Sequence, residues 1–76
     1  MRSQNAIRIE GIVKEVLPSG VYRVAFRNGH VVIGHLSRKD KMSGKNFSPG
    51  ENVTVEMSPY DFSQGRIRVW RFETEL

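Results

Sequence analysis

Most side chains that could do chemistry in this sequence are cationic, and they gather in two stretches. Residues 37–45, "SRKDKMSGK", hold four lysines and arginines and a single aspartate. Residues 66–71, "RIRVWR", alternate arginines with apolar side chains and include the tryptophan. Guanidinium and ammonium groups bind phosphates, and an exposed indole ring can stack on a base. This chemistry favours a nucleic-acid partner.

Further candidates lie on the predicted strands. Arg23 and Arg27 fall on the outer face of a strand over 21–27, and His35 can stack on RNA or hydrogen-bond to it. Each candidate also has a simpler interpretation as solvated surface charge or as the charged edge of a sheet. The pattern leaves both interpretations open. The predicted RNA-binding residues are Arg23, Arg27, His35, Arg38, Lys39, Lys41, Lys45, Arg66, Arg68, Trp70 and Arg71.

Catalysis and metal binding are not expected. The sequence has no cysteine, and its two histidines, His30 and His35, fall on opposite faces of a predicted strand. A structural metal site needs about four such ligands together. Asp40 and Asp61 are isolated in the sequence, and no nucleophile is paired with a base. We therefore predict a protein that is not an enzyme and has no metal or other cofactor.

Length and composition limit the protein class. We expect one domain over 1–76, with a short flexible N-terminus (1–5) and an acidic C-terminal tail (73–76). Twelve Lys and Arg against eight Asp and Glu give a net charge of +4, which favours a polyanionic partner. No apolar stretch is long enough for a signal peptide or a membrane span. The absence of cysteine is compatible with a reducing cytoplasm.

The elements that must position these residues are predicted to be strands. The first strand alternates apolar and polar side chains and is interrupted at Gly11, as in a bulged or bent strand. The stretch "LPSG" (17–20) supplies a turn, and Asn28-Gly29 predicts a type I′ hairpin. These signals define a three-stranded meander. Its strands are predicted over 6–16, 21–27 and 30–36.

Five strands are predicted in all. An insertion over 37–51 separates the third strand from a strand over 52–57, and Ser37 can cap a helix there that Ser43-Gly44 would end. This order predicts an all-β, five-stranded, partly open Greek-key barrel (OB-fold) with a short irregular or one-turn helical insertion between strands 3 and 4. An SH3-like barrel is the alternative. The long, bent first strand and the place of the insertion favour the OB-fold.

The loop "SPYDFSQG" (58–65) is predicted to be stiff and to aim Arg66 at RNA. A proline starts the turn, and Asp61 can accept backbone hydrogen bonds within the loop. Gly65 would then reverse the chain into a last strand that begins at Arg66. We expect Tyr60 to pack against the barrel rather than to stack on a base.

Three blocks of the sequence resemble the bacterial translation initiation factor one family. They are "IEGIVKEVLPSGVYRV" (9–24), "NGHVVIGHLS" (28–37) and "SPYDFSQGRI" (58–67). The resemblance implies a cytoplasmic factor that occupies the decoding (A) site of the small ribosomal subunit during initiation. It would contact rRNA and a neighbouring ribosomal protein, act with the other two bacterial initiation factors and hydrolyse nothing. We expect a monomer without membrane contact.

By position, the resemblance places Lys39 and Lys41 among the basic loop residues of that family and Arg66 in its Gly-Arg-Ile motif. Tyr60 and Asp61 match its Tyr-Asp pair. Two segments depart from the family pattern, and for them the resemblance implies the fold more strongly than it implies the family's contacts. These segments are the less basic insertion over 38–48 and the Trp70-containing end over 68–76.

Two other function classes remain open. The first is a free OB-fold that binds single-stranded RNA or acts as an RNA chaperone. It predicts stacked aromatic rings on the second and third strands, but Tyr22 and Phe26 share the parity of Val24 in the core. The second is a protein-interaction module whose basic surface is incidental.

Overall fold

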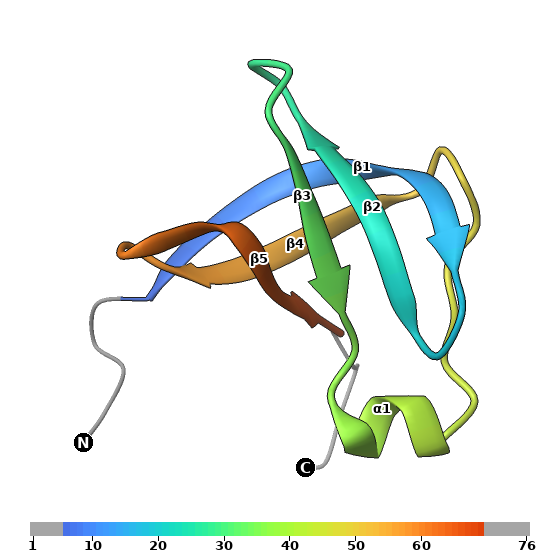
Figure 1. Ribbon diagram of the computed structural model, residues 1–76. Coiled ribbons are helices and arrows are strands. Elements are labelled where there is room, and N and C mark those ends of the chain that lie inside the picture. Colours follow the sequence, from blue (N-terminus) through green and yellow to red (C-terminus); the bar gives the residue numbers. More distant parts are fainter. Residues whose placement is uncertain (1–5, 70–76) are drawn as a thin grey trace, which may run out of the picture.

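The computed structural model describes residues 6–69, which form a barrel of five strands with one short helix beneath it (Figure 1). No helix in this part of the chain is long and apolar enough to cross a membrane. The elements are β1 (Ile7–Leu17), β2 (Val21–Phe26), β3 (Val31–His35), α1 (Arg38–Met42), β4 (Asn52–Ser58) and β5 (Asp61–Arg68).

The long first strand allows the barrel to close. β1 pairs antiparallel with β4 along its first half and with β2 along its second half. β3 pairs in parallel with β5, from Ile33–Gln64 to His35–Arg66, which completes the order β1-β2-β3-β5-β4. The predicted five-stranded OB-fold with its insertion between strands 3 and 4 is confirmed, except that the barrel is closed and not partly open.

Alternation along the strands builds the core as predicted. Val13, Val24, Val55 and Ile67 are completely buried at the centre, one each from β1, β2, β4 and β5. Burial of such side chains is the main favourable term in a domain of this size. Tyr22 and Phe26 are also buried in the core, so neither ring is a stacking platform for bases.

The turn at 17–20 is confirmed, but the hairpin at Asn28-Gly29 differs from the prediction. At Asn28-Gly29 only the glycine has positive φ, and the Gly29 N–H donates to the Phe26 carbonyl, so a three-residue loop replaces the type I′ turn. The positive-φ pair is instead Ser19-Gly20, at φ values of 62° and 73°. The sequence signal identified both hairpins, but it assigned the left-handed pair to the wrong one.

β5 begins at Asp61, five residues earlier than predicted, because the turn after β4 is very tight. Ser58 already pairs with Asp61 across the hairpin. The polar residues after Asp61 suggested a loop, but they lie in a strand whose outward face is solvated. The prediction of a loop over 58–65 is therefore wrong. Arg66 lies inside a paired strand, opposite Glu56 of β4 and His35 of β3.

Two glycines permit close contacts between backbones, and Gly65 does not have its predicted role. A Cβ at Gly65 would lie 2.6 Å from Val55 Cγ1 and 2.7 Å from the Glu56 carbonyl oxygen, so Gly65 allows β5 to pack across β4 rather than reversing the chain. At Gly11 a Cβ would lie 2.8 Å from the Ala25 carbonyl oxygen. The register shift of β1 lies further along the strand, between Val13 and Glu15, and not at Gly11.

Candidate nucleic-acid interface

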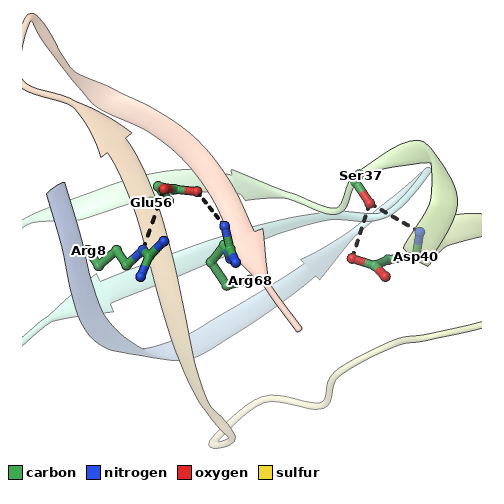
Figure 2. Close-up of polar contacts among 5 residues, drawn as sticks. All are labelled: Arg8, Ser37, Asp40, Glu56 and Arg68. Carbon is green, nitrogen blue, oxygen red and sulfur yellow. Dashed lines mark hydrogen bonds and ion pairs between the residues drawn. The ribbon is translucent and has the colours of Figure 1, made fainter. Parts of the chain in front are cut away.

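The helix α1 is short but well capped. Ser37 is its N-cap: the Ser37 Oγ accepts a hydrogen bond from the Asp40 N–H at 3.1 Å and donates to the Asp40 carboxylate, also at 3.1 Å (Figure 2). At the other end, the Ser43 Oγ donates to the Asp40 carbonyl at 2.8 Å. N-cap hydrogen bonds satisfy backbone groups that a helix end leaves free. Serines at both ends therefore fix the one-turn helix that the sequence predicted.

The two central lysines of α1 point in different directions. Residues two apart on a helix are about 200° apart around its axis. The Lys41 Nζ donates to the Ser19 carbonyl at 3.4 Å, so this side chain lies against the turn between β1 and β2. Lys39 instead lines a hollow shared with β5. The two lysines therefore contact different parts of the barrel, and only Lys39 shares the hollow with β5.

The hollow between α1 and β5 brings candidate residues together from distant parts of the chain. It has a volume of about 190 Å³, and Lys39 and Arg66 line it together with Asp40 and Arg68. His35 is directly opposite Arg66 in the β3–β5 ladder. We call the exposed cations at this end of the barrel, on α1 and the end of β5, the cationic end. Its members are Arg38, Lys39, Lys41 and Arg66.

Other arginines are neutralised by neighbouring carboxylates. Glu56 lies between Arg68, at 3.0 Å, and Arg8, at 3.5 Å (Figure 2). Partial burial opposes ionisation of Glu56, but the hydrogen bond and charge of Arg68, with a contribution from Arg8, outweigh it and lower the pKa of Glu56 below its ordinary value. A phosphate that approached Arg68 would have to compete with Glu56.

The predicted candidates on β2 and in the loop after α1 lie apart from the cationic end. The Arg23 guanidinium donates to Glu15 at 3.0 Å on the outer face of the barrel. Arg27 is exposed in the turn between β2 and β3. The Lys45 ammonium lies 5.2 Å from the centre of the Phe47 ring, which packs edge-on against Tyr22. Trp70 and Arg71 lie outside the described residues.

The turn between β4 and β5 holds an aromatic ring that the sequence interpretation misplaced. Tyr60 is 86% exposed, so the expectation that it packs against the barrel is wrong. The Asp61 carboxylate accepts hydrogen bonds from the Ser63 hydroxyl at 2.6 Å and from the Ser63 N–H at 3.0 Å, as predicted for this loop. These bonds, with a longer one from Gln64, lower the pKa of Asp61.

Tyr60 projects because its turn is so short. Ser58 pairs directly with Asp61, so Tyr60 lies in the turn itself and not in either strand. Tyr60 and Arg66 both line a second hollow of about 530 Å³, together with His35. In the sequence, Pro59 was the signal for this tight turn, because proline favours turns.

Comparison with known proteins agrees with this structure. No family model matches the chain. The chain is similar to the solution structure of translation initiation factor one from the Wolbachia endosymbiont strain TRS of Brugia malayi, with a TM-score of 0.71 and 36% sequence identity. The alignment covers 96% of this chain and 87% of the other. Because so high an identity extends over nearly the whole chain, the chain belongs to the translation initiation factor one family and is a translation initiation factor.

Proposed function

We propose that this initiation factor binds the decoding (A) site of the small ribosomal subunit. It contacts rRNA through its cationic end and a neighbouring ribosomal protein elsewhere on its surface. It acts in the cytoplasm as a monomer, together with the other initiation factors. The proposal includes no chemical step: the factor acts by occupying its site.

One observation carries the proposal: Lys39 and Arg66 line a single hollow although they come from different elements. Both side chains are exposed, and neither has an ion-pair partner among the described residues. Phosphates of structured RNA are bound by such convergent cations, which fix the position of a protein without reading sequence. Membership of the initiation factor family supports ribosomal RNA as the ligand.

Chemical probing of rRNA in purified small subunits tests the site. Binding of the wild-type chain should protect nucleotides at the decoding site, and protection elsewhere would contradict the proposal. In a salt series, Lys39→Ala and Arg66→Ala should each weaken binding by about 1 kcal/mol and lower the salt slope by about one unit. Arg23→Ala is the matched control, because Glu15 already neutralises this exposed arginine.

Binding to free single-stranded RNA is a second candidate, favoured by the exposed rings of Tyr60 and Phe62 near the start of β5. Each ring can stack on a base. A titration with an unstructured oligonucleotide separates the two functions. We expect much weaker binding to the oligonucleotide than to small subunits. Equal affinities would favour the single-strand function.

A further inference from the structure

The outer surface of β1, β2 and β3 carries a contiguous set of aliphatic side chains. Ile12 pairs with Ala25 across β1 and β2, and Ala25 pairs with Val31 across β2 and β3. Ile33, two residues after Val31 on the same face of β3, extends the set along the strand. We call Ile12, Ala25, Val31 and Ile33 the apolar patch.

The apolar patch is open to solvent. Ile12 is 43% exposed and Val31 is 45% exposed, while Ala25 and Ile33 are half-buried. A groove of about 360 Å³ runs over Ile12 and Ala25, and Lys14 and Arg27 line the same groove. A single exposed aliphatic side chain on a sheet needs no explanation, but a continuous set across three strands does.

RNA is a poor fit to this surface. Bases stack on aromatic rings, whereas the apolar patch contains only aliphatic side chains. Of the nearby arginines, Arg23 already donates to Glu15 at 3.0 Å, and Arg27 shares its groove with Glu10. Apolar contacts with a charged border are instead typical of protein interfaces.

The border of the groove indicates the charge of the partner. Lys14 and Arg27 are exposed, and neither has an ion-pair partner among the residues that the structure describes. Glu10 also lines the groove, on the side of Arg27 rather than of Lys14, because Gly11 pairs with Phe26 in the register of β1 and β2. A protein segment that places aliphatic side chains over Ile12 and Val31 would meet both cations with acidic residues.

We propose that the apolar patch is a second docking surface, which binds an acidic protein segment through aliphatic side chains. The patch is smaller than a stable interface requires, so docking alone is weak. Once the cationic end holds the factor on the small subunit, the local concentration of the segment becomes high enough for binding. In this respect the inference rests on the proposed function.

Site-specific crosslinking identifies the chemistry of the partner. A photoreactive phenylalanine analogue replaces Val31 in one sample and Met42, an 80% exposed residue at the end of α1, in another. Both are bound to purified small subunits with the other initiation factors present. The position-31 crosslink should resist ribonuclease and map to an acidic peptide. The position-42 crosslink should be destroyed by ribonuclease.

Each contrary result has a separate meaning. Position-31 crosslinks that ribonuclease destroys, that map to a peptide without acidic residues, or that fail to form on subunit-bound factor would overturn the docking proposal. Failure of position 42 to crosslink to rRNA would instead overturn the proposed function. A protein crosslink from position 31 then still stands as evidence for the docking surface.

Substitutions test the same surface without a crosslinker. The double variant Ile12→Thr, Val31→Thr should weaken binding to small subunits about fivefold to tenfold, as the loss of part-buried aliphatic contact at both positions predicts. Its salt slope should stay at the wild-type value, because no charge has changed. Val16→Thr is the matched control, since Val16 is 49% exposed on β1 and lies outside the apolar patch. Wild-type affinity in the double variant would overturn the proposal.

Discussion

The cationic end and the apolar patch lie on one small barrel but differ in how their charges are arranged. At the cationic end, Lys39 and Arg66 line one hollow together with Asp40 and Arg68, and neither Lys39 nor Arg66 has an ion pair within 4.0 Å among the described residues. Beside the apolar patch, Arg23 is paired with Glu15. Lys14 and Arg27 beside the patch have no ion-pair partner among the described residues, but they flank aliphatic side chains instead of sharing a hollow with other cations. The net charge alone could not have distinguished the two surfaces.

Both surfaces are built on one barrel, so a substitution that disrupts the close packing of β5 against β4 should have the largest effect. Gly65→Ala would place a methyl group 2.6 Å from Val55 Cγ1 and 2.7 Å from the Glu56 carbonyl oxygen. We expect the free energy of unfolding to fall by about 3 kcal/mol, because the backbone of β4 cannot move aside. Urea denaturation measures the change.

A glycine in open space provides the control for that substitution. Gly44 has φ of 84° and no atom within 4 Å of an added Cβ, so Gly44→Ala should cost only about 1 kcal/mol of backbone strain. Equal losses in the two variants would mean that the contact between β4 and β5 is not tight.

The next largest effect should separate the cations of α1. Lys39 and Arg66 share a hollow, whereas Lys41 lies against the turn between β1 and β2. A double-mutant cycle of Lys39→Ala and Arg66→Ala should show a coupling energy of at least about 0.5 kcal/mol in subunit binding. The cycle of Lys41→Ala and Arg66→Ala should be additive. Strong coupling in both cycles would mean that all three residues form one RNA surface.

The strands and the core could be predicted from the sequence, but several contacts at the surface could not. Alternation of apolar residues predicted the strands and the core, since a period of two maps directly onto the faces of a sheet. The contacts of Glu56 with Arg8 and Arg68 depend on the register of three strands, which turn signals do not fix. Tyr60 was misplaced because its exposure depends on the tightness of one hairpin.

Loss of the helix cap should have an effect that is confined to one region. Ser37→Ala removes the hydroxyl that accepts from the Asp40 N–H, and should cost about 1 kcal/mol of helix stability. Subunit affinity should fall because Lys39 is no longer held beside β5. Ser37→Asn retains a capping oxygen and should restore both values. The position-31 crosslink should survive in all three proteins, and its loss with Ser37→Ala would show that the two regions are coupled.

The smallest expected effect concerns Glu56, which neutralises two arginines outside the cationic end. Burial opposes ionisation of Glu56, but Arg68 and Arg8 together lower its pKa, so the folded protein holds this proton less tightly than the unfolded chain does. The resulting stabilisation is fully present above about pH 4.5, the ordinary value, and is lost as pH falls through the lower, folded-state pKa. Its size should be below about 1 kcal/mol, because water screens the exposed arginines.

Glu56→Gln should therefore lose stability at neutral pH but little in acid, so its unfolding free energy should depend less on pH than that of the wild type. Glu10→Gln, an exposed neighbour across β1 and β4, is the control and should keep the wild-type pH dependence. At neutral pH, Glu56→Gln also leaves Arg8 and Arg68 without their carboxylate, so the salt slope of subunit binding should steepen. An unchanged slope would show that these arginines stay out of reach of the rRNA, and that the cationic end alone faces it.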